Sequence, residues 1–544
     1  MHKICYILLV ILLIGCKAKK EEVAQDFTIY NETTEIKDQQ AHENPRMKFK
    51  LIQSKVLDMN EVFKPFQNEL SKFSETDYSS LKPLILEKSI PSIQKAIKAG
   101  KLNYEKLILF YLYRIKKFES DSTKYLNAVI SLNPNVVEEA RQKDKTLKEK
   151  NISTESIFGM PILLKDNINT DNLPTTAGAL ALKDNRTGNA FIVEKLKENG
   201  ALILGKVNLS EWAYYFCAGC PLGYSAIGGQ TLNPYGRKVF ETGGSSAGSG
   251  VATAANYAVA TIGTETAGSI TSPSSQNSVV GLKPTIGVLS RSGIVPISST
   301  LDTPGPMTKN VIDNYILFKA MLGLDATDKK SKEFNEIAEE LNPTELKGKR
   351  FGVIASLLEN PVYKKTTESL REAGVEVVEL TPEQTSLEGF LTLLNIDMKY
   401  DLPHYFEGKP VSVTSVEDVI TFNKKDSILR APYGQQLFEG IVKDTTSLED
   451  LEKVKSSLKT NSRIYFSALE SDNLDAILSI NNYHSAYSAV AEYPNLTIPM
   501  GYKETGEPMN LTLIGKPKSE FTLLSLGLSI ENLTKIRKLP KGYE

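Results

Sequence analysis

The stretch ETGGSSAGSG spans residues 241–250 and runs directly into VATAANYAVA at residues 251–260. Glycine and serine at this density usually form a flexible linker. The residues that follow are small and mostly apolar, with no polar break, which is typical of a packed helix. A flexible-looking segment placed against a packed one requires a structural or chemical reason.

Three glycine-rich motifs can be compared with this stretch. A phosphate-binding P-loop needs lysine directly after its last glycine, where this chain has Val251. A dinucleotide-binding fingerprint needs glycine or alanine where this chain has Thr253. The G-x-S-x-G nucleophile elbow matches, with Ser246 at its centre, and it requires a later histidine, either His404 or His484. An elbow esterase that uses Ser246 and His484 is therefore one alternative.

Strand-like apolar runs alternate with helical patterns along the chain. Residues 191–216 are predicted to form a helix, a strand and a second helix, and residues 346–380 a β-α-β unit. Further strands are predicted near the C-terminus, before a closing amphipathic helix: 474–480, 495–502 and 509–516. The pattern predicts one large α/β domain with a central mixed β-sheet covered by helices on both faces. Residues 325–475 are the most charged and least patterned, which favours a peripheral variable segment.

The composition narrows the classes of function. The formal net charge is -1 and the charged residues are mixed in sign, so no nucleic-acid partner is expected. Four histidines and four cysteines leave little for metal chemistry, and we expect no metal and no cofactor. Cys217 and Cys220 have C-x-x-C spacing without nearby histidines, which disfavours zinc. A local disulfide and two free buried thiols both remain open.

The first residues, MHKICYILLVILLIGC, have the pattern of an export signal. A positive charge at Lys3 precedes an apolar run too short to span a bilayer as a helix. The end of the run, residues 13–16, resembles the lipobox of bacterial lipoproteins, in which the cysteine, here Cys16, is lipidated. A plain secretory signal is the alternative. Residues 17–45 are charged and poor in large apolar side chains, so they are predicted to form a disordered tether. The expected location is the bacterial cell envelope, with lipid anchoring to a membrane.

Several motifs in one order identify a resemblance to a known family. Alongside GGSSAGSG, the chain carries GMPILLKDN, GALILGKVNLSEWA, GTETAGSI, GLKP, SRSGIVPISSTLDTPGPM and YPNLTIPMGY. Together these resemble the amidase signature family of serine hydrolases over about residues 80–310, with a weaker match over about 470–540. The GTET…GSI version and GGQTLNPY look most like the peptide-amidase branch. The resemblance implies an amidase domain over residues 46–544, with the signature core at about 150–310.

The resemblance implies a mechanism for this chain. Ser269 would be the nucleophile, Ser245 the bridging serine and Lys165 the general base, which must be uncharged and therefore buried. The peptide bond between Gly244 and Ser245 would be cis, and the glycines would serve close backbone approach rather than flexibility. The reaction would hydrolyse a linear carboxamide to a carboxylate and ammonia or an amine through an acyl-enzyme.

The same resemblance implies an oxyanion hole built from backbone N–H groups just before the nucleophile. In this chain those groups belong to Thr266, Ala267, Gly268 and Ser269. Glu265 would organise the loop rather than react. Thr271 stands where many members have arginine, so their substrate preference does not transfer directly.

The remaining expectations concern roles and partners. Ser246 is predicted to cap the following helix. The substrate would be a small-molecule or short peptide amide, and the membrane contact would be the N-terminal lipid. Some family members amidate transfer RNA within multi-subunit complexes, a role not expected of an exported lipoprotein. A catalytically silent binding lipoprotein is a further alternative. The sequence does not indicate an oligomeric state.

Overall fold

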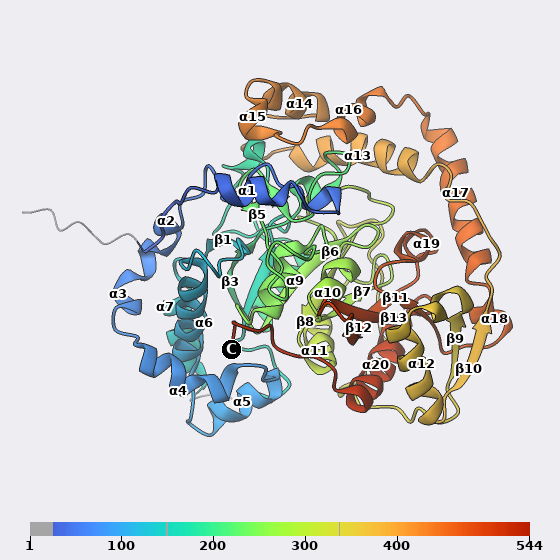
Figure 1. The fold of residues 1–544 in the computed structure, drawn as a ribbon, viewed down its shortest axis with the longest axis horizontal. Helices are drawn as coiled ribbons and strands as arrows, with labels where there is room; N and C mark the ends of the chain where they lie inside the picture. Colours follow the sequence, from blue (N-terminus) through green and yellow to red (C-terminus); the bar gives the residue numbers. More distant parts are fainter. Residues whose placement is uncertain (1–25, 148–150, 337) are drawn as a thin grey trace, which may run out of the picture.

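An eleven-stranded mixed sheet forms the centre of the computed structural model, which describes residues 26–147, 151–336 and 338–544 (Figure 1). The strands follow the spatial order β1 (Val129–Leu132), β3 (Leu202–Val207), β2 (Pro161–Lys165), β6 (Ala260–Glu265), β8 (Thr303–Thr308), β7 (Val280–Lys283), β12 (Asn495–Tyr502), β13 (Pro508–Ile514), β11 (Ala476–Ile480), β9 (Arg350–Ile354) and β10 (Glu376–Leu380). A separate two-stranded sheet pairs β4 (Tyr224–Ser225) with β5 (Gly229–Gln230).

The large sheet has two groups of parallel strands joined by a run of antiparallel pairings. β3, β2 and β6 run parallel, as do β11, β9 and β10, and the strands between these two groups pair antiparallel. Every residue of β2, β3 and β6 is buried, as expected for parallel strands enclosed on both faces. The predicted α/β fold with a mixed central sheet flanked by helices is confirmed.

Helices pack along the sheet and connect its strands. α9 (Ala247–Ala254) contacts β6 and β2, α11 (Val311–Met321) contacts β8, and the predicted closing helix, α20 (Glu520–Thr534), contacts β12. The other helices of this body are α2 (Met59–Phe63), α3 (Gln67–Leu70), α4 (Glu75–Ile85), α5 (Ile90–Lys98), α6 (Tyr104–Glu119), α7 (Val136–Leu147), α8 (Phe191–Glu198), α10 (Thr271–Gln276), α12 (Pro361–Glu372), α18 (Ala468–Ser471) and α19 (Ser485–Val490).

The segment predicted to be peripheral divides into two parts. Its first part contains β9, α12 and β10, which confirm the β-α-β unit predicted over residues 346–380. These strands extend the central sheet, so the prediction of a peripheral segment is wrong for residues 350–380. Its second part forms a layer of helices along the upper and right-hand rim of Figure 1, outside the sheet: α13 (Phe390–Phe406), α14 (Val416–Lys424), α15 (Ser427–Arg430), α16 (Gln436–Lys443) and α17 (Leu448–Tyr465). Four of these helices, α13, α14, α16 and α17, share one apolar cluster with residues 212–220 of the central body.

The predicted tether differs from the structure at its C-terminal end. Residues 26–45 include helix α1 (Thr33–Gln39) and pack on the domain, because buried Glu32 accepts hydrogen bonds from the backbone N–H groups of Ile52 and Gln53 at 3.2 and 2.7 Å. The signal, the lipobox with Cys16 and residues 17–25 lie outside the described residues. Within the described ranges, no helix combines the length and apolarity needed to cross a membrane.

The second helix predicted within 191–216 is a short 3-10 turn, η4 (Glu211–Tyr214). Trp212, Ala213 and Tyr214 have φ angles of 50°, 55° and 75°. This backbone is incompatible with a continuing α-helix. The turn instead carries Tyr214 toward the cavity described below.

Candidate active site

The site begins at Lys165, the last residue of the buried strand β2. Its side chain is fully buried, and its Nζ atom lies 2.8 Å from Ser245 Oγ, 2.7 Å from Thr264 Oγ1 and 3.1 Å from the Thr264 carbonyl oxygen. A neutral amine has two N–H donors and one lone pair. The two oxygens of Thr264 can accept the two N–H groups, which leaves the lone pair to accept the proton of Ser245.

The surroundings of Lys165 favour its neutral form. Burial lowers the pKa of Lys165 from 10.5 to about 7, against the opposing effect of the Asp302 and Glu265 carboxylates. Within the described residues, no carboxylate forms an ion pair with Lys165. An amine with this pKa is partly uncharged at neutral pH, as a general base must be.

Ser245 lies on the glycine-rich stretch that opened the sequence. The Gly244–Ser245 peptide bond is cis, and the Ser245 carbonyl accepts a hydrogen bond from the Ser210 N–H at 3.0 Å. A Cβ atom at Gly243, whose φ is +65°, would lie 2.7 Å from the Pro273 backbone, and one at Gly248 would lie 2.4 Å from the Asn208 carbonyl oxygen. The glycines therefore permit close backbone packing, as the resemblance implied.

Ser269 lies on the loop between β6 and α10, beside the stretch that carries Ser245. The Ser246 N–H donates to the Ser269 carbonyl at 3.2 Å, which joins the two loops. Ser269 is half-buried and lines a cavity. Among the residues that the structure describes, the backbone N–H groups of Ala267, Gly268 and Ser269 donate to no protein atom. They are available to stabilise negative charge on a bound oxygen.

Glu265 holds this loop through its side chain. Its Oε2 atom accepts from the Ile270 and Thr271 N–H groups at 2.7 and 2.9 Å, and from the Thr271 hydroxyl at 3.1 Å. The Thr271 hydroxyl also lies 2.9 Å from Ser485 Oγ. Glu265 therefore organises the loop that carries Ser269, and the Thr271 hydroxyl is engaged by both Glu265 and Ser485.

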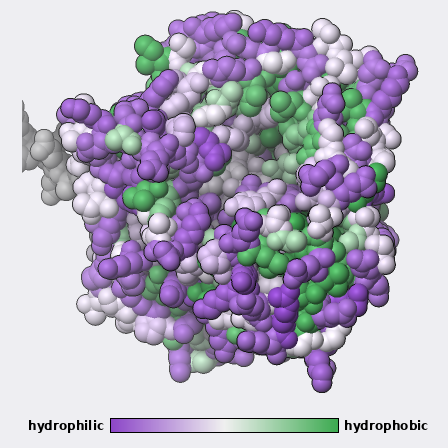
Figure 2. All heavy atoms as spheres, turned by 45° about the vertical axis from the view of Figure 1, so that its right-hand side comes forward, coloured by the Kyte–Doolittle hydropathy of each residue, from purple (hydrophilic) through white to green (hydrophobic). Residues whose placement is uncertain are grey.

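The loops enclose a cavity of about 410 Å³, which is large enough for a small organic or peptide-like ligand. Its floor includes Gly244 and the loop from Thr266 to Ser269. Its walls come from the turn at Tyr214, from α13 and from the loop before α19. Figure 2, which turns the side of α17 forward, shows the molecule hollowed near its middle, with apolar side chains in the walls.

Comparison with known proteins gives the family of this chain. The model of the amidase family matches residues 106–450. A probable amidase of Arabidopsis thaliana is 36% identical over 480 residues, which cover 84% of this chain and 92% of that protein. This chain belongs to the amidase family. The predicted resemblance is confirmed, and the protein is therefore an amide carbon–nitrogen hydrolase.

Solved structures support the same assignment of this amidase. An amidase family protein from Bacillus anthracis superposes with a TM-score of 0.86 and 37% identity, covering 90% of this chain and all of that chain. The native peptide amidase from Stenotrophomonas maltophilia superposes with a TM-score of 0.79 and 36% identity, covering 84% of this chain and 98% of that chain. These two neighbours share the fold across most of the amidase.

The elbow alternative is contradicted by the contacts of its two residues in this amidase. Ser246 Oγ is fully buried, donates to the Thr264 carbonyl at 3.0 Å and accepts from the Thr264 N–H at 3.2 Å. His484 Nδ1 lies 2.6 Å from Ser479 Oγ, and burial lowers the pKa of His484 to about 4. The two side chains serve separate structural contacts. The prediction that Ser246 caps α9 with its side chain is also wrong: it occupies the N-cap position without a capping hydrogen bond.

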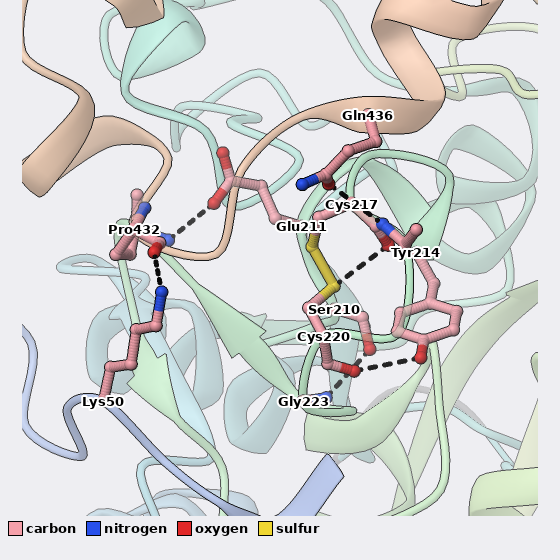
Figure 3. The surroundings of a disulfide bond; sticks show 11 residues. Lys50, Ser210, Glu211, Tyr214, Cys217, Cys220, Gly223, Pro432 and Gln436 are labelled. Carbon is pink, nitrogen blue, oxygen red and sulfur yellow. Dashed lines mark hydrogen bonds between the residues drawn. A yellow bond between two sulfur atoms is a disulfide. The ribbon is translucent and has the colours of Figure 1, made fainter. Parts of the chain in front are cut away.

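Cys217 and Cys220 form a disulfide in the loop after η4, which decides between the two possibilities left open by the sequence. The Tyr214 hydroxyl donates to the Cys220 carbonyl at 2.9 Å, and the Ala218 N–H donates to Gln436 on α16 at 3.3 Å (Figure 3). The disulfide loop therefore connects the helical layer to the wall of the cavity.

Sequence reasoning missed several residues around Lys165. Thr264 supplies two of its three partners, and Asn167 Nδ2 donates to the same Thr264 hydroxyl at 3.0 Å. Next to Lys165 in the chain, Asp166 forms a buried ion pair with Lys206 at 3.1 Å. The motifs GMPILLKDN, GALILGK and GTETAGSI contain all of these residues. The sequence does not indicate which strands lie side by side, so it could not show that these residues meet around Lys165.

A second cavity, of about 440 Å³, lies away from this site. It is lined by residues 27–30 and 53–60, by the end of α6 and by the segment up to Val129, and it includes none of the residues named above for catalysis. This second cavity is therefore separate from the candidate active site at Ser269.

Proposed function

We propose that this amidase hydrolyses uncharged carboxamides, including the amides of short peptides, through an acyl-enzyme on Ser269. Lys165 takes the proton of Ser245 while Ser245 takes the proton of Ser269, and Ser269 Oγ attacks the carbonyl carbon. The N–H groups of the nucleophile loop stabilise the resulting oxyanion. As the carbon–nitrogen bond breaks, Ser245 returns a proton to the leaving nitrogen. Water then reverses the sequence and releases the carboxylate.

One observation carries this proposal. A buried lysine with a lowered pKa lies 2.8 Å from Ser245 Oγ, directly behind a loop whose free N–H groups and Ser269 face a cavity. Within the described part of the chain, Lys165 has neither a carboxylate partner nor an exposed ammonium group, and its Nζ atom contacts the hydroxyl of Ser245. This arrangement is suited to proton transfer.

The substrate proposal has two supports. The peptide amidase from Stenotrophomonas maltophilia shares 36% of its sequence with this chain over most of the fold. The cavity here is much larger than a carboxamide group, and its walls include Leu222, Ile297, Phe390 and Leu394. These apolar side chains can bury the hydrocarbon part of an acyl group.

The test is ammonia release from a panel of peptide amides, short aliphatic amides and aryl amides. We expect wild-type activity on peptide amides and its loss in Lys165→Ala and Ser269→Ala. A serine-directed phosphonate probe should label wild type and His484→Ala, but neither of the first two variants. Loss of labelling in His484→Ala would support the elbow esterase, and an unlabelled wild type would support a silent binding protein.

We also propose that the amidase is exported and lipid-anchored through Cys16 in the bacterial cell envelope, with residues 17–25 as the remaining tether. The lipobox-like residues 13–16 support this proposal. Metabolic labelling with an alkyne fatty acid should mark wild type and fail for Cys16→Ala, which should leave the membrane fraction. Equal membrane retention and no labelling of either form would contradict the proposal.

A further inference from the structure

The chain before the family-matched region forms a strap, residues 30–46, that reaches the active-site cavity. It contacts the segment 238–241, which leads into the glycine-rich loop that carries Ser245. The contacts are Glu35 with Lys238 at 2.8 Å, Gln39 Nε2 with the Lys238 carbonyl at 3.0 Å, His42 Nε2 with the Val239 carbonyl at 3.1 Å, and Arg46 with Glu241. The strap lies before the region that the family model matches, which begins at residue 106.

Arg46 is the residue of the strap that lines the cavity, together with Ser269. Its Nε and Nη2 atoms lie 2.8 and 2.9 Å from the two oxygens of Glu241, so one edge of the guanidinium is bound. The other edge carries Nη1. The guanidinium also hydrogen-bonds the Tyr214 side chain, and its five N–H groups leave donors for a ligand beyond these two partners. The side chain is 42% exposed. A planar guanidinium held on one edge is pre-oriented to donate from the other.

The charges of the cavity wall indicate what Arg46 can bind. The charged side chains that line it are Arg46, Glu241 and Lys503. Arg46 is paired with Glu241, and Lys503 with Glu507 at 2.7 Å. A wall whose charges are already paired favours a neutral acceptor over a free carboxylate. When ammonia is the leaving group, the acyl part of the substrate must fill most of the 410 Å³. The neutral acceptor is therefore on the acyl side.

We propose that Arg46 is a specificity-determining residue, which donates a hydrogen bond to the carbonyl oxygen of the peptide group that precedes the cleaved amide. The inference rests on the proposed function and makes it narrower. The preferred substrates are N-acylated amino-acid and peptide amides, while simple amides that lack this second carbonyl are poorer substrates.

The test compares two amides with the same phenyl ring and the same cleaved group: N-acetyl-phenylalanine amide and 3-phenylpropionamide. A hydrogen bond to a charged group contributes enough to change binding about tenfold to a hundredfold. We expect Arg46→Ala to lower kcat/KM by about that factor for the N-acetyl substrate and by less than about threefold for the other, with the larger part of the change in KM. Arg46→Lys should restore part of the loss.

A matched control separates recognition from anchoring of the strap. Lys238→Ala removes the ion pair with Glu35 at the other end of the strap and leaves the cavity wall intact. It should leave the ratio of the two kcat/KM values unchanged. An equal fall on both substrates in Arg46→Ala, or no fall on either, would overturn the inference while the proposed function stands. Absence of ammonia release from both substrates by wild type would overturn the proposed function itself.

Discussion

The state of Lys165 predicts a specific pH dependence. A lysine with the usual pKa of 10.5 is neutral in about one molecule in 3000 at pH 7, whereas a pKa of about 7 leaves about half neutral. Burial thus increases the active form about a thousandfold at this pH. In the folded protein it disfavours the ammonium by about 5 kcal/mol relative to the exposed side chain, at 1.36 kcal/mol per pKa unit.

The expected profile of kcat/KM rises with pH through a limb near pH 7 and falls about tenfold per pH unit below it, because protonation removes the base. Replacing Asp302 tests whether this limb reports the pKa of Lys165. The charge of Asp302 opposes the lowered pKa of Lys165 more than any other group does, and its carboxylate is held by Thr266 Oγ1 at 2.6 Å. The isosteric change Asp302→Asn removes that charge, so the limb should move to lower pH.

The assay is ammonia release from a peptide amide between pH 5 and pH 9, with kcat/KM fitted at each pH. The quantity compared is the pH at which the limb lies, not the maximum value of kcat/KM. The maximum can also change because Asp302 contacts Thr266 on the loop that carries Ser269. Asp171→Asn, which alters a half-exposed carboxylate paired with Lys197, should leave the limb in place. A wild-type profile that stays flat down to pH 5, or a limb that moves to higher pH in Asp302→Asn, would refute Lys165 as the base.

Four further outcomes follow from the described contacts. Lys165→Met should unfold at a higher temperature than wild type. The difference should be largest below pH 7, where burying a charged lysine destabilises the wild-type fold. It should shrink toward pH 10.5, because between these two pH values the unfolded chain still binds a proton that the folded chain has lost. Ser246→Ala should keep phosphonate labelling while losing about 1–3 kcal/mol in urea unfolding, since it leaves the buried Thr264 N–H group unpaired. His484→Phe should retain full amidase activity, and a loss above tenfold would reopen the elbow esterase. Replacing Cys217 and Cys220 by serine should lower the free energy of unfolding by about 2 kcal/mol, as measured in urea; no change would show that the loop is held without the disulfide.

The sequence predicted the parts of the site that depend on local pattern. Lys165 at the end of an apolar run was expected to be buried, and it is the last residue of a fully buried strand. The glycines around Ser245 were expected to allow close packing, and the side-chain positions that Gly243, Gly248 and Gly250 lack are occupied by backbone atoms. These features follow from residue type and immediate neighbours, which a sequence contains.

The features that sequence reasoning missed depend on contacts between distant segments. The ordered strap around Glu32 looked like a solvated tether because its own composition is polar, and its partners lie at residues 52 and 238. The turn at Trp212 looked helical because nothing local indicates three successive positive φ angles. The β-α-β unit that contains β9 and β10 was predicted at residues 346–380, but its place at the edge of the central sheet was not, because the charge of residues 325–475 was taken as a sign of a peripheral segment.

Two buried lysines show why spatial context decides function here. Lys165 and Lys206 lie on adjacent parallel strands, and both are fully buried. Lys206 Nζ lies 3.1 Å from an Asp166 carboxylate oxygen and 3.0 Å from Thr175 Oγ1. Burial lowers the pKa of Lys206 as well, but here the counter-charge of Asp166 opposes that effect and favours the ammonium form. Lys165 Nζ is surrounded by two hydroxyls and a carbonyl, which can hydrogen-bond an amine without requiring its charge. Although both lysines are buried, Lys206 therefore has a structural role, whereas Lys165 is available for proton transfer. The difference lies in their partners, which are the Asp166 carboxylate for Lys206 and uncharged oxygens for Lys165.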